Sequence, residues 1–240
     1  MKLKKLITCS LLLAPAFMMA QKHIQQPQYP DSGFINKAEA KNITIDGKKE
    51  GMWIDYLDSL RRLTTDTNAP YYALNVYKAG KFTKLERGYY KSGKLMFRIH
   101  YDNGRENGRE ENFYEDGKVR SDAMVINDTL HGTVKFYYPN GKMKSLTNYF
   151  HGIKVGEVKV YYENGNIHQE AEYSDGVPNG TVTTYYEDGK LKDVDTYDNG
   201  NLNGLSKMYY EDGKLERTVS YNEGTPGEIK NYDENGNEIK

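Results

Sequence analysis

Residues 179–204 read NGTVTTYYEDGKLKDVDTYDNGNLNG, and the six letters YYEDGK at 185–190 occur again at 209–214, 24 positions later. A catalytic site is needed only once in a chain, so an identical repeat indicates architecture. The second Tyr of the motif recurs with the same spacing, at Tyr90, Tyr114, Tyr138, Tyr162, Tyr186 and Tyr210. The sequence therefore predicts a tandem array of short repeated units.

Each unit carries a Gly three positions after this Tyr, and in most units Asn or Asp precedes the Gly, as in Asn164-Gly165. Such pairs favour two-residue type I′ turns, which join the two strands of a β-hairpin. With this pair as the turn, Val158 faces Ala171 and Tyr162 faces Ile167, because the turn fixes the pairing register. Each unit is therefore expected to be one hairpin, joined to the next by a short polar loop.

The predicted register separates an apolar face of the sheet from a polar one, because successive side chains of a strand point to opposite faces. Val158, Val160 and Ala171 share the apolar face. The second Tyr of each motif is expected to seal this face as structural core, namely Tyr114, Tyr138, Tyr162, Tyr186 and Tyr210.

A second aromatic column falls on the polar face, beside lysines. Its members are Phe113, Tyr137, Tyr161, Tyr185 and Tyr209. An exposed aromatic ladder is typical of surfaces that bind sugars, peptides or a partner protein. We therefore take these residues as the candidate binding site. The alternative is cross-strand stacking that only stiffens the sheet.

Four glycines form a further column, and each falls opposite a Tyr in the predicted register. They are Gly132, Gly156, Gly180 and Gly204, facing Tyr149, Tyr173, Tyr197 and Tyr221. An aromatic ring that lies across a facing glycine covers backbone that the glycine leaves bare. The pattern suggests that these Gly and Tyr residues are structural partners.

The repeats extend over residues 77–240 and predict an all-β fold, an elongated antiparallel meander of hairpins that forms an open twisted sheet. Residues 46–76 look like a degenerate first repeat with an insertion, and residues 21–45 read as a leader. Residues 1–20 have a basic start, an apolar run and a small residue at Ala20, which is typical of a cleaved signal peptide. We therefore expect export to the periplasm, the cell envelope or the medium, with a retained N-terminal anchor as the alternative.

Composition argues against several functional classes. The single Cys9 lies in the signal segment, so the mature chain has no thiol for catalysis, disulfides or metal. The whole chain has 33 basic and 34 acidic residues, and cleavage of the signal peptide would remove three lysines. The mature chain is therefore mildly acidic and lacks the positive charge that nucleic-acid binding requires. The histidines lack metal-ligand spacing, and the carboxylates at turns form no catalytic pair. We expect no catalysis, no metal and no cofactor.

The unit at 179–204 resembles the MORN repeat in its bacterial variant form, through Gly180, Tyr185-Tyr186, Asp188-Gly189, Tyr197 and Gly200. The resemblance covers roughly residues 77–240. Bacterial proteins with this variant are often described as antitoxins of toxin–antitoxin systems. Eukaryotic relatives are linked to membrane-associated scaffolding and phospholipid contact.

Together these observations predict a secreted or cell-envelope scaffold, without catalysis, that mediates protein–protein interaction through the aromatic ladder. One alternative is a module that binds a cell-wall glycan or a phospholipid membrane surface. The other is the antitoxin-like role that the resemblance implies.

Overall fold

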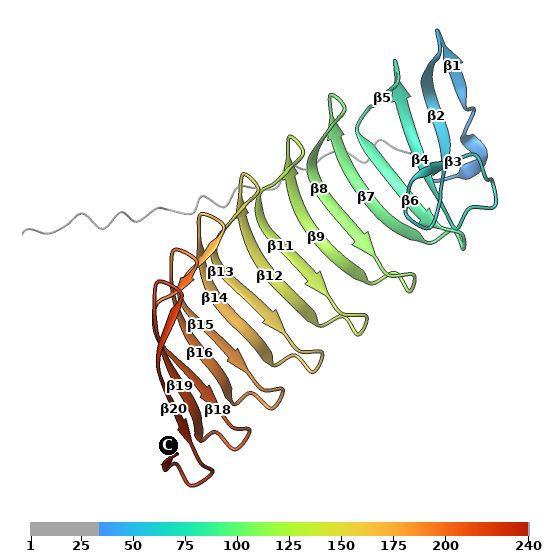
Figure 1. Cartoon of the computed structure of the whole chain (residues 1–240). Helices are drawn as coiled ribbons and strands as arrows, with labels where there is room; N and C mark the ends of the chain where they lie inside the picture. Colours follow the sequence, from blue (N-terminus) through green and yellow to red (C-terminus); the bar gives the residue numbers. More distant parts are fainter. Residues whose placement is uncertain (1–33, 240) are drawn as a thin grey trace, which may run out of the picture.

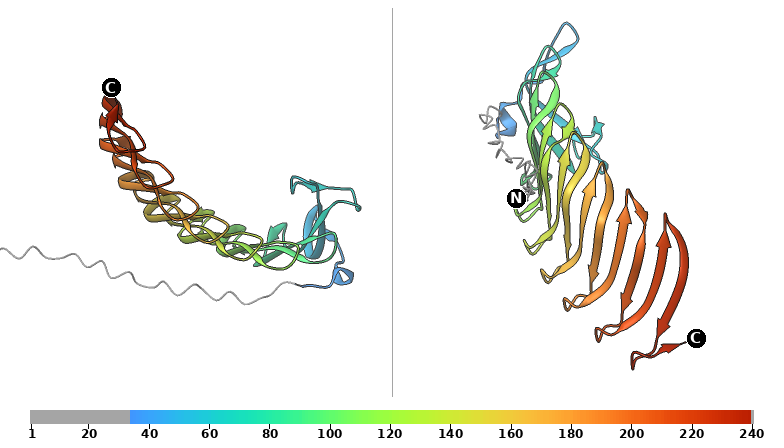
Figure 2. Two further views of the ribbon diagram at one scale, coloured as in Figure 1. Left: turned by 90° about the horizontal axis from the view of Figure 1, so that it is seen from below. Right: turned by 90° about the vertical axis from the view of Figure 1, so that its left-hand side faces the viewer.

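The computed structural model of the protein describes residues 34–239. The expected signal peptide, its cleavage after Ala20 and the first part of the expected leader lie outside the described residues. The described chain forms one long antiparallel sheet that is open and curved, so the predicted fold class is confirmed. Figure 1 shows the strands following one another from the N-terminal end to the C-terminus, and Figure 2 shows the curvature of the sheet from two further directions.

The N-terminal elements form a separate region that we call the cap, residues 34–78. They are η1 (Lys37–Glu39), β1 (Ile43–Ile45), β2 (Lys48–Leu57), β3 (Leu63–Thr64) and β4 (Tyr71–Lys78). The predicted insertion lies between β2 and β4, and these two strands pair directly, with Trp53 opposite Asn75.

The remaining strands form the array, residues 81–239. They are β5 (Lys81–Phe82), β6 (Leu85–Tyr90), β7 (Leu95–Asp102), β8 (Arg105–Phe113), β9 (Val119–Ile126), β10 (Thr129–Leu130), β11 (Gly132–Tyr137), β12 (Met143–Phe150), β13 (Ile153–Tyr161), β14 (Ile167–Ser174), β15 (Val177–Tyr185), β16 (Leu191–Asp198), β17 (Asn201–Leu202), β18 (Gly204–Tyr209), β19 (Leu215–Asn222), β20 (Thr225–Tyr232) and β21 (Glu238–Ile239).

The turn at Asn164-Gly165 differs from the predicted type. The amide of Gly165 donates to the carbonyl of Tyr162 at 2.9 Å, and the amide of Tyr162 donates to the carbonyl of Asn166 at 2.8 Å. In this turn only Gly165 has a positive φ, of 98°. This is a three-residue loop with a type I turn and a glycine bulge, so the predicted two-residue type I′ turn was wrong here.

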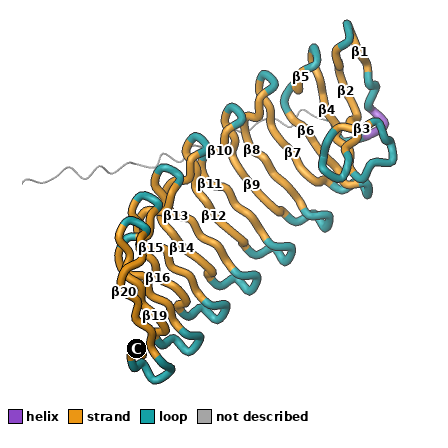
Figure 3. The backbone as a smooth tube through the Cα atoms, in the orientation of Figure 1, coloured by secondary structure: helices purple, strands orange, loops and turns teal. Residues whose placement is uncertain are grey.

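Type I′ turns lie instead at the opposite rim of the sheet, where the sequence predicted only connecting loops. Asn199 and Gly200 both have positive φ, of 47° and 84°, and the flanking Asp198 and Asn201 pair directly. Figure 3 shows the two rows of turns, one along each rim. Tight turns at both rims make each long strand pair with the long strands before and after it. The short strands β5, β10 and β17 pair with the same preceding strand as β6, β11 and β18, which follow them.

The predicted register holds within the strands and shifts beside the bulged turn. Val158 pairs with Ala171, as predicted. Tyr161, rather than Tyr162, pairs with Ile167, because the extra loop residue moves the register by one at the strand end.

The cap and the array bury their side chains differently. In the cap, Phe34 packs with Leu74 in one cluster. A second cluster joins the cap to the array, because Leu57 of β2 packs with Phe97 of β7. In the array the sheet is a single layer (Figures 1 and 2), and its buried apolar residues are mostly small. From residue 119 onward they are Ala123, Met124, Val125, Val134, Val158, Ala171, Val182 and Val219.

Candidate functional site

The predicted binding ladder is half-buried, so its expected exposure to solvent was wrong. All five members, Phe113, Tyr137, Tyr161, Tyr185 and Tyr209, fall in this intermediate class. The guanidinium of Arg98 lies over the Phe113 ring, 5.8 Å from its centroid. The Tyr185 hydroxyl donates to Glu170 Oε1 at 2.5 Å, and this bond raises the pKa of Tyr185 to about 12. Part of the ladder therefore already has partners within the sheet.

The second Tyr of each motif joins one repeat to the next through its hydroxyl group. Each donates to the backbone carbonyl of a residue 22 or 23 positions later, at 2.7–2.9 Å: Tyr90 to Phe113, Tyr114 to Tyr137, Tyr138 to Tyr161, Tyr162 to Tyr185, Tyr186 to Tyr209 and Tyr210 to Tyr232. The ladder thus supplies five of these six acceptors. The constant 24-residue spacing of the pair of adjacent aromatic residues was visible in the sequence. The sequence analysis did not predict that the second Tyr of each pair donates a hydrogen bond to the next repeat.

The rings of these hydroxyl-donating tyrosines also contact polar and charged side chains near the bulged turns. The Tyr162 ring lies 4.6 Å from the ring of His168. Lys144 Nζ lies 5.5 Å from the centroid of the Tyr138 ring. The assignment of these tyrosines to the apolar face, as structural core, stays a prediction.

The glycine column pairs with tyrosines as predicted, but its physical reason is different. Gly156 pairs with Tyr173. A Cβ built on Gly156 would have only Glu172 Oε1 within 4 Å, so the Tyr173 ring does not lie against it. The φ of Gly156 is +68°, and the other three, Gly132, Gly180 and Gly204, also have positive φ. Glycine is favoured at these positions by the backbone, because side chains disfavour this conformation.

The apolar face of the array is uncovered, and we call it the open face. It carries the column Phe136, Val160, Thr184 and Met208, which the strand pairing places beside Val134, Val158, Val182 and Ser206. The exposed fractions of Phe136 and Met208 are 44% and 38%. Large apolar side chains therefore remain accessible in the centre of the sheet and near its C-terminal end.

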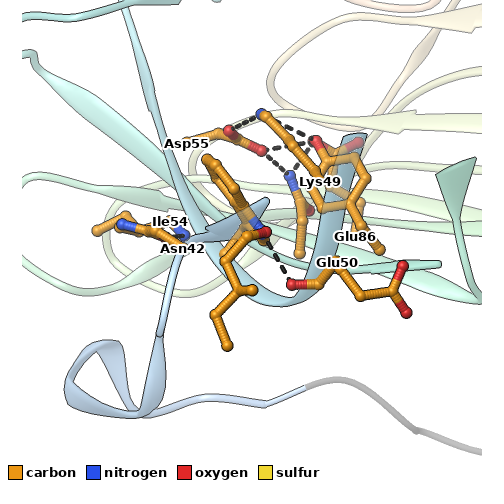
Figure 4. Close-up of polar contacts among 10 residues, drawn as sticks. Asn42, Lys49, Glu50, Ile54, Asp55 and Glu86 are labelled. Carbon is orange, nitrogen blue, oxygen red and sulfur yellow. Dashed lines mark hydrogen bonds and ion pairs between the residues drawn. The ribbon is translucent and has the colours of Figure 1, made fainter. Parts of the chain in front are cut away.

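A cluster of polar side chains is buried where the cap meets the array, and the sequence did not predict it. We call it the joint cluster; Figure 4 shows part of it. Asp55 accepts hydrogen bonds from Asn75 Nδ2 at 2.8 Å and from the Tyr77 hydroxyl at 2.7 Å, and it is paired with Lys49. Lys49 Nζ also lies 4.8 Å from the ring centroid of Trp53. The Asp55 carboxylate is thus compensated by one ammonium group and two neutral donors.

Glu86 is the second carboxyl group of the joint cluster. The Tyr101 hydroxyl donates to Glu86 Oε2 at 3.1 Å, and Asn75 Nδ2 lies 3.5 Å from Glu86 Oε1. Burial raises the pKa of Glu86 to about 7. Burial also raises the pKa of Tyr77 and Tyr101, so both phenols remain neutral donors.

Within residues 34–239, no group of three or more His, Cys, Asp or Glu side chains could hold a metal ion. Nor does this part of the chain contain a helix long and apolar enough to span a membrane.

Comparison with known families agrees with the repeat geometry. The family described as MORN repeat variant matches six consecutive segments that together make up more than half of the chain: residues 83–103, 106–127, 130–151, 154–175, 178–199 and 202–223. Each of the last five segments contains two strands around a bulged turn and ends in a type I′ turn. No curated protein matches this sequence. The chain belongs to the MORN repeat variant family.

Proposed function

We propose that the protein is an exported scaffold, without catalytic activity, that binds a protein partner along the open face of its array. Its family membership supports a binding role toward proteins or membranes. The observation that carries the protein-binding proposal is the exposure of two large apolar side chains, Phe136 and Met208, in one column of a sheet face with no second layer. An antiparallel sheet usually packs one face on a core, and a bare apolar face is typical of an interaction surface.

The partner is proposed to be a protein with an extended apolar surface. The open face continues over successive repeats, and its exposed residues include both an aromatic and a thioether side chain, Phe136 and Met208. Methionine and aromatic side chains are enriched at protein interfaces. Binding across several repeats would combine many modest contacts, as expected for an elongated repeat protein.

The test is affinity purification from the cell-envelope fraction, followed by mass spectrometry. The variant Phe136→Ser/Met208→Ser is expected to lose the partner that the wild type retains. The matched control is Lys135→Ser/Lys207→Ser, because these lysines neighbour the altered residues in the same strands and point to the opposite face. Retention by the open-face variant, or equal loss by the control, would contradict the proposal.

The glycan alternative places the interaction on the ladder of the polar face. Its test is retention on purified cell wall, with Tyr137→Ala/Tyr161→Ala/Tyr185→Ala as the variant. Under our proposal the wild type shows no retention that depends on these three rings. Specific retention that the triple variant loses would favour the glycan-binding role.

Export is part of the proposal and rests on the N-terminal sequence. N-terminal sequencing of the protein from the envelope or the medium is expected to begin at Gln21. An uncleaved chain that co-purifies with a toxin from the cytoplasm would favour the antitoxin-like role instead.

A further inference from the structure

The joint cluster departs from the repeat pattern at its most buried positions. In the 24-residue frame, Glu86 and Glu110 occupy the column that Val134, Val158 and Val182 fill in later repeats. Asn75 occupies the column of Ala123, Ala171 and Val219, and it is only 1% exposed. Local departures from a consistent sequence pattern tend to occur at functional sites. Most later repeats fill these two columns with apolar residues, and a polar pair occurs there only near the C-terminal end of the described array, where the Ser206 hydroxyl donates to Asp195.

Hydrogen bonds of the joint cluster connect five strands across the boundary of cap and array. Asp55 lies on β2, Asn75 on β4, Glu86 on β6 and Tyr101 on β7. The Tyr101 hydroxyl lies 3.1 Å from Glu86 and also 3.5 Å from Glu106 on β8. The cluster therefore contributes directly to holding the cap on the first repeats.

The charges around Glu86 do not balance when its carboxyl group is ionised. From β2 it faces Asp55, which is already paired with Lys49, and from β8 it faces Glu106. From β4 and β7 it meets only neutral donors, Asn75 and Tyr101. Ionised Glu86 would thus be a buried carboxylate between two others, and burying a charge without a counter-charge is unfavourable.

Asn75 provides an independent sign that the joint cluster lacks a hydrogen-bond donor when Glu86 is ionised. Its Nδ2 bonds to Asp55, whereas its buried Oδ1 has no hydrogen-bond partner within residues 34–239. Buried acceptors without a partner are uncommon in folded proteins. A carboxylic acid can donate a hydrogen bond, but a carboxylate can only accept one.

We propose that Glu86 is a proton switch at the boundary of cap and array. Protonated Glu86 holds β2 and β4 on β6 to β8. Ionised Glu86 loosens the cap while leaving the distant repeats unchanged.

The direction of the pH dependence follows from proton binding. The pKa of Glu86 is about 7 in the folded protein, against an ordinary value of 4.5. Between these two values the folded state binds more protons than the open state, so closure of the cap weakens as the pH rises. The stabilisation is complete below the ordinary pKa and is lost as the pH passes through that of the folded state.

The test is amide hydrogen exchange of the full chain at pH 5.5 and 8.5, corrected for intrinsic exchange rates. Protection of β2 and β4 in the wild type is expected to fall by on the order of tenfold at the higher pH. Protection of β16 to β20 is expected to stay constant and serves as the internal reference. Equal losses at both ends of the sheet would overturn the proposal, because they would report global stability.

Two variants of Glu86 and one control complete the experiment. Glu86→Gln keeps the shape and a hydrogen-bond donor, and it is expected to remove the pH dependence. Glu86→Val, the residue of the later repeats, is expected to do the same and provides a second variant if the first fails to fold. The exposed Glu172→Gln is expected to behave as the wild type. Unchanged pH dependence in both Glu86 variants, or none in the wild type, would overturn the proposal.

Discussion

At the scale of single residues, the hydroxyl group of one Tyr per repeat connects neighbouring units. Replacing Tyr162 by Phe removes the donor to the Tyr185 carbonyl at 2.7 Å and keeps the ring. The free energy of unfolding is expected to fall by about 1 kcal/mol, the usual net value of one hydrogen bond. Guanidinium denaturation followed by circular dichroism measures it.

The control for this prediction is the adjacent Tyr161. Its carbonyl accepts from Tyr138, but its own hydroxyl has no hydrogen bond within the described residues. Tyr161→Phe is therefore expected to leave the free energy of unfolding within about 0.5 kcal/mol of the wild type, as for most surface changes. Equal losses in both variants would mean that the hydroxyl bonds do not stabilise the repeats.

Gly156 gives a second prediction, which separates backbone strain from ring packing. Because its φ is +68°, Gly156→Ala is expected to lower the free energy of unfolding by about 1–2 kcal/mol. Gly156→Asn is expected to cost less, since Asn tolerates positive φ better. If glycine were required at this position because of contact with the Tyr173 ring, the larger Asn would lower the free energy of unfolding more than Ala in the same denaturation experiment.

At the scale of strands and turns, the type I′ turn of Ala79-Gly80 offers a stabilising change. Ala79 has a φ of +51°, where a residue with a Cβ atom is disfavoured. Ala79→Asn is expected to raise the free energy of unfolding by up to about 1 kcal/mol, because Asn is a preferred residue of this turn type. Its effect appears as a higher midpoint of guanidinium unfolding with an unchanged slope.

The matched control is Ala38→Asn in η1, an exposed Ala outside the positive-φ set. This change is expected to give no stabilisation. A gain of the same size at both positions would show that Asn acts through something other than the turn geometry.

The strands could be predicted from the sequence because their signals are local and repeated. The assumed turn at Asn164-Gly165 placed Val158 opposite Ala171 correctly, because the register shift between Val160 and Tyr161 offsets the extra loop residue. The turn types could not be told apart, because Asn-Gly at 164–165 forms a bulged type I turn and Asn-Gly at 199–200 forms a type I′ turn. In the bulged turn, the side-chain Oδ1 of Asn164 accepts from the amide of Asn166 at 2.8 Å.

The candidate sites were predicted less completely than the strands. The ladder was identified by its period, but contacts such as the bond from Tyr185 to Glu170 join different hairpins and are not evident from the period alone. The joint cluster was missed because Asp55 lies before the insertion, where the repeat frame is broken. Glu86 and Asn75 in otherwise apolar columns were the available signal.

At the scale of the whole molecule, each repeat contacts mainly its neighbours, so the array should tolerate loss of one complete unit. Deleting residues 154–177 removes one repeat and keeps the frame, because the same positions of the next unit follow at residue 178. The shortened protein is expected to fold and to lose about 10 Å of maximum dimension, the width of two strands. Small-angle X-ray scattering measures this length.

A deletion of half a repeat tests whether the repeat or the single strand is the structural unit. Removing residues 154–165 deletes one strand with its bulged turn, so the chain would enter the next strand from the wrong rim of the sheet. This variant is expected to lose cooperative unfolding, since the bulged turns and type I′ turns could no longer alternate along the array. The hydroxyl bonds between repeats would lose their spacing as well. If the half-repeat deletion unfolded as cooperatively as the full-repeat deletion, the alternation of turn types would not determine the fold.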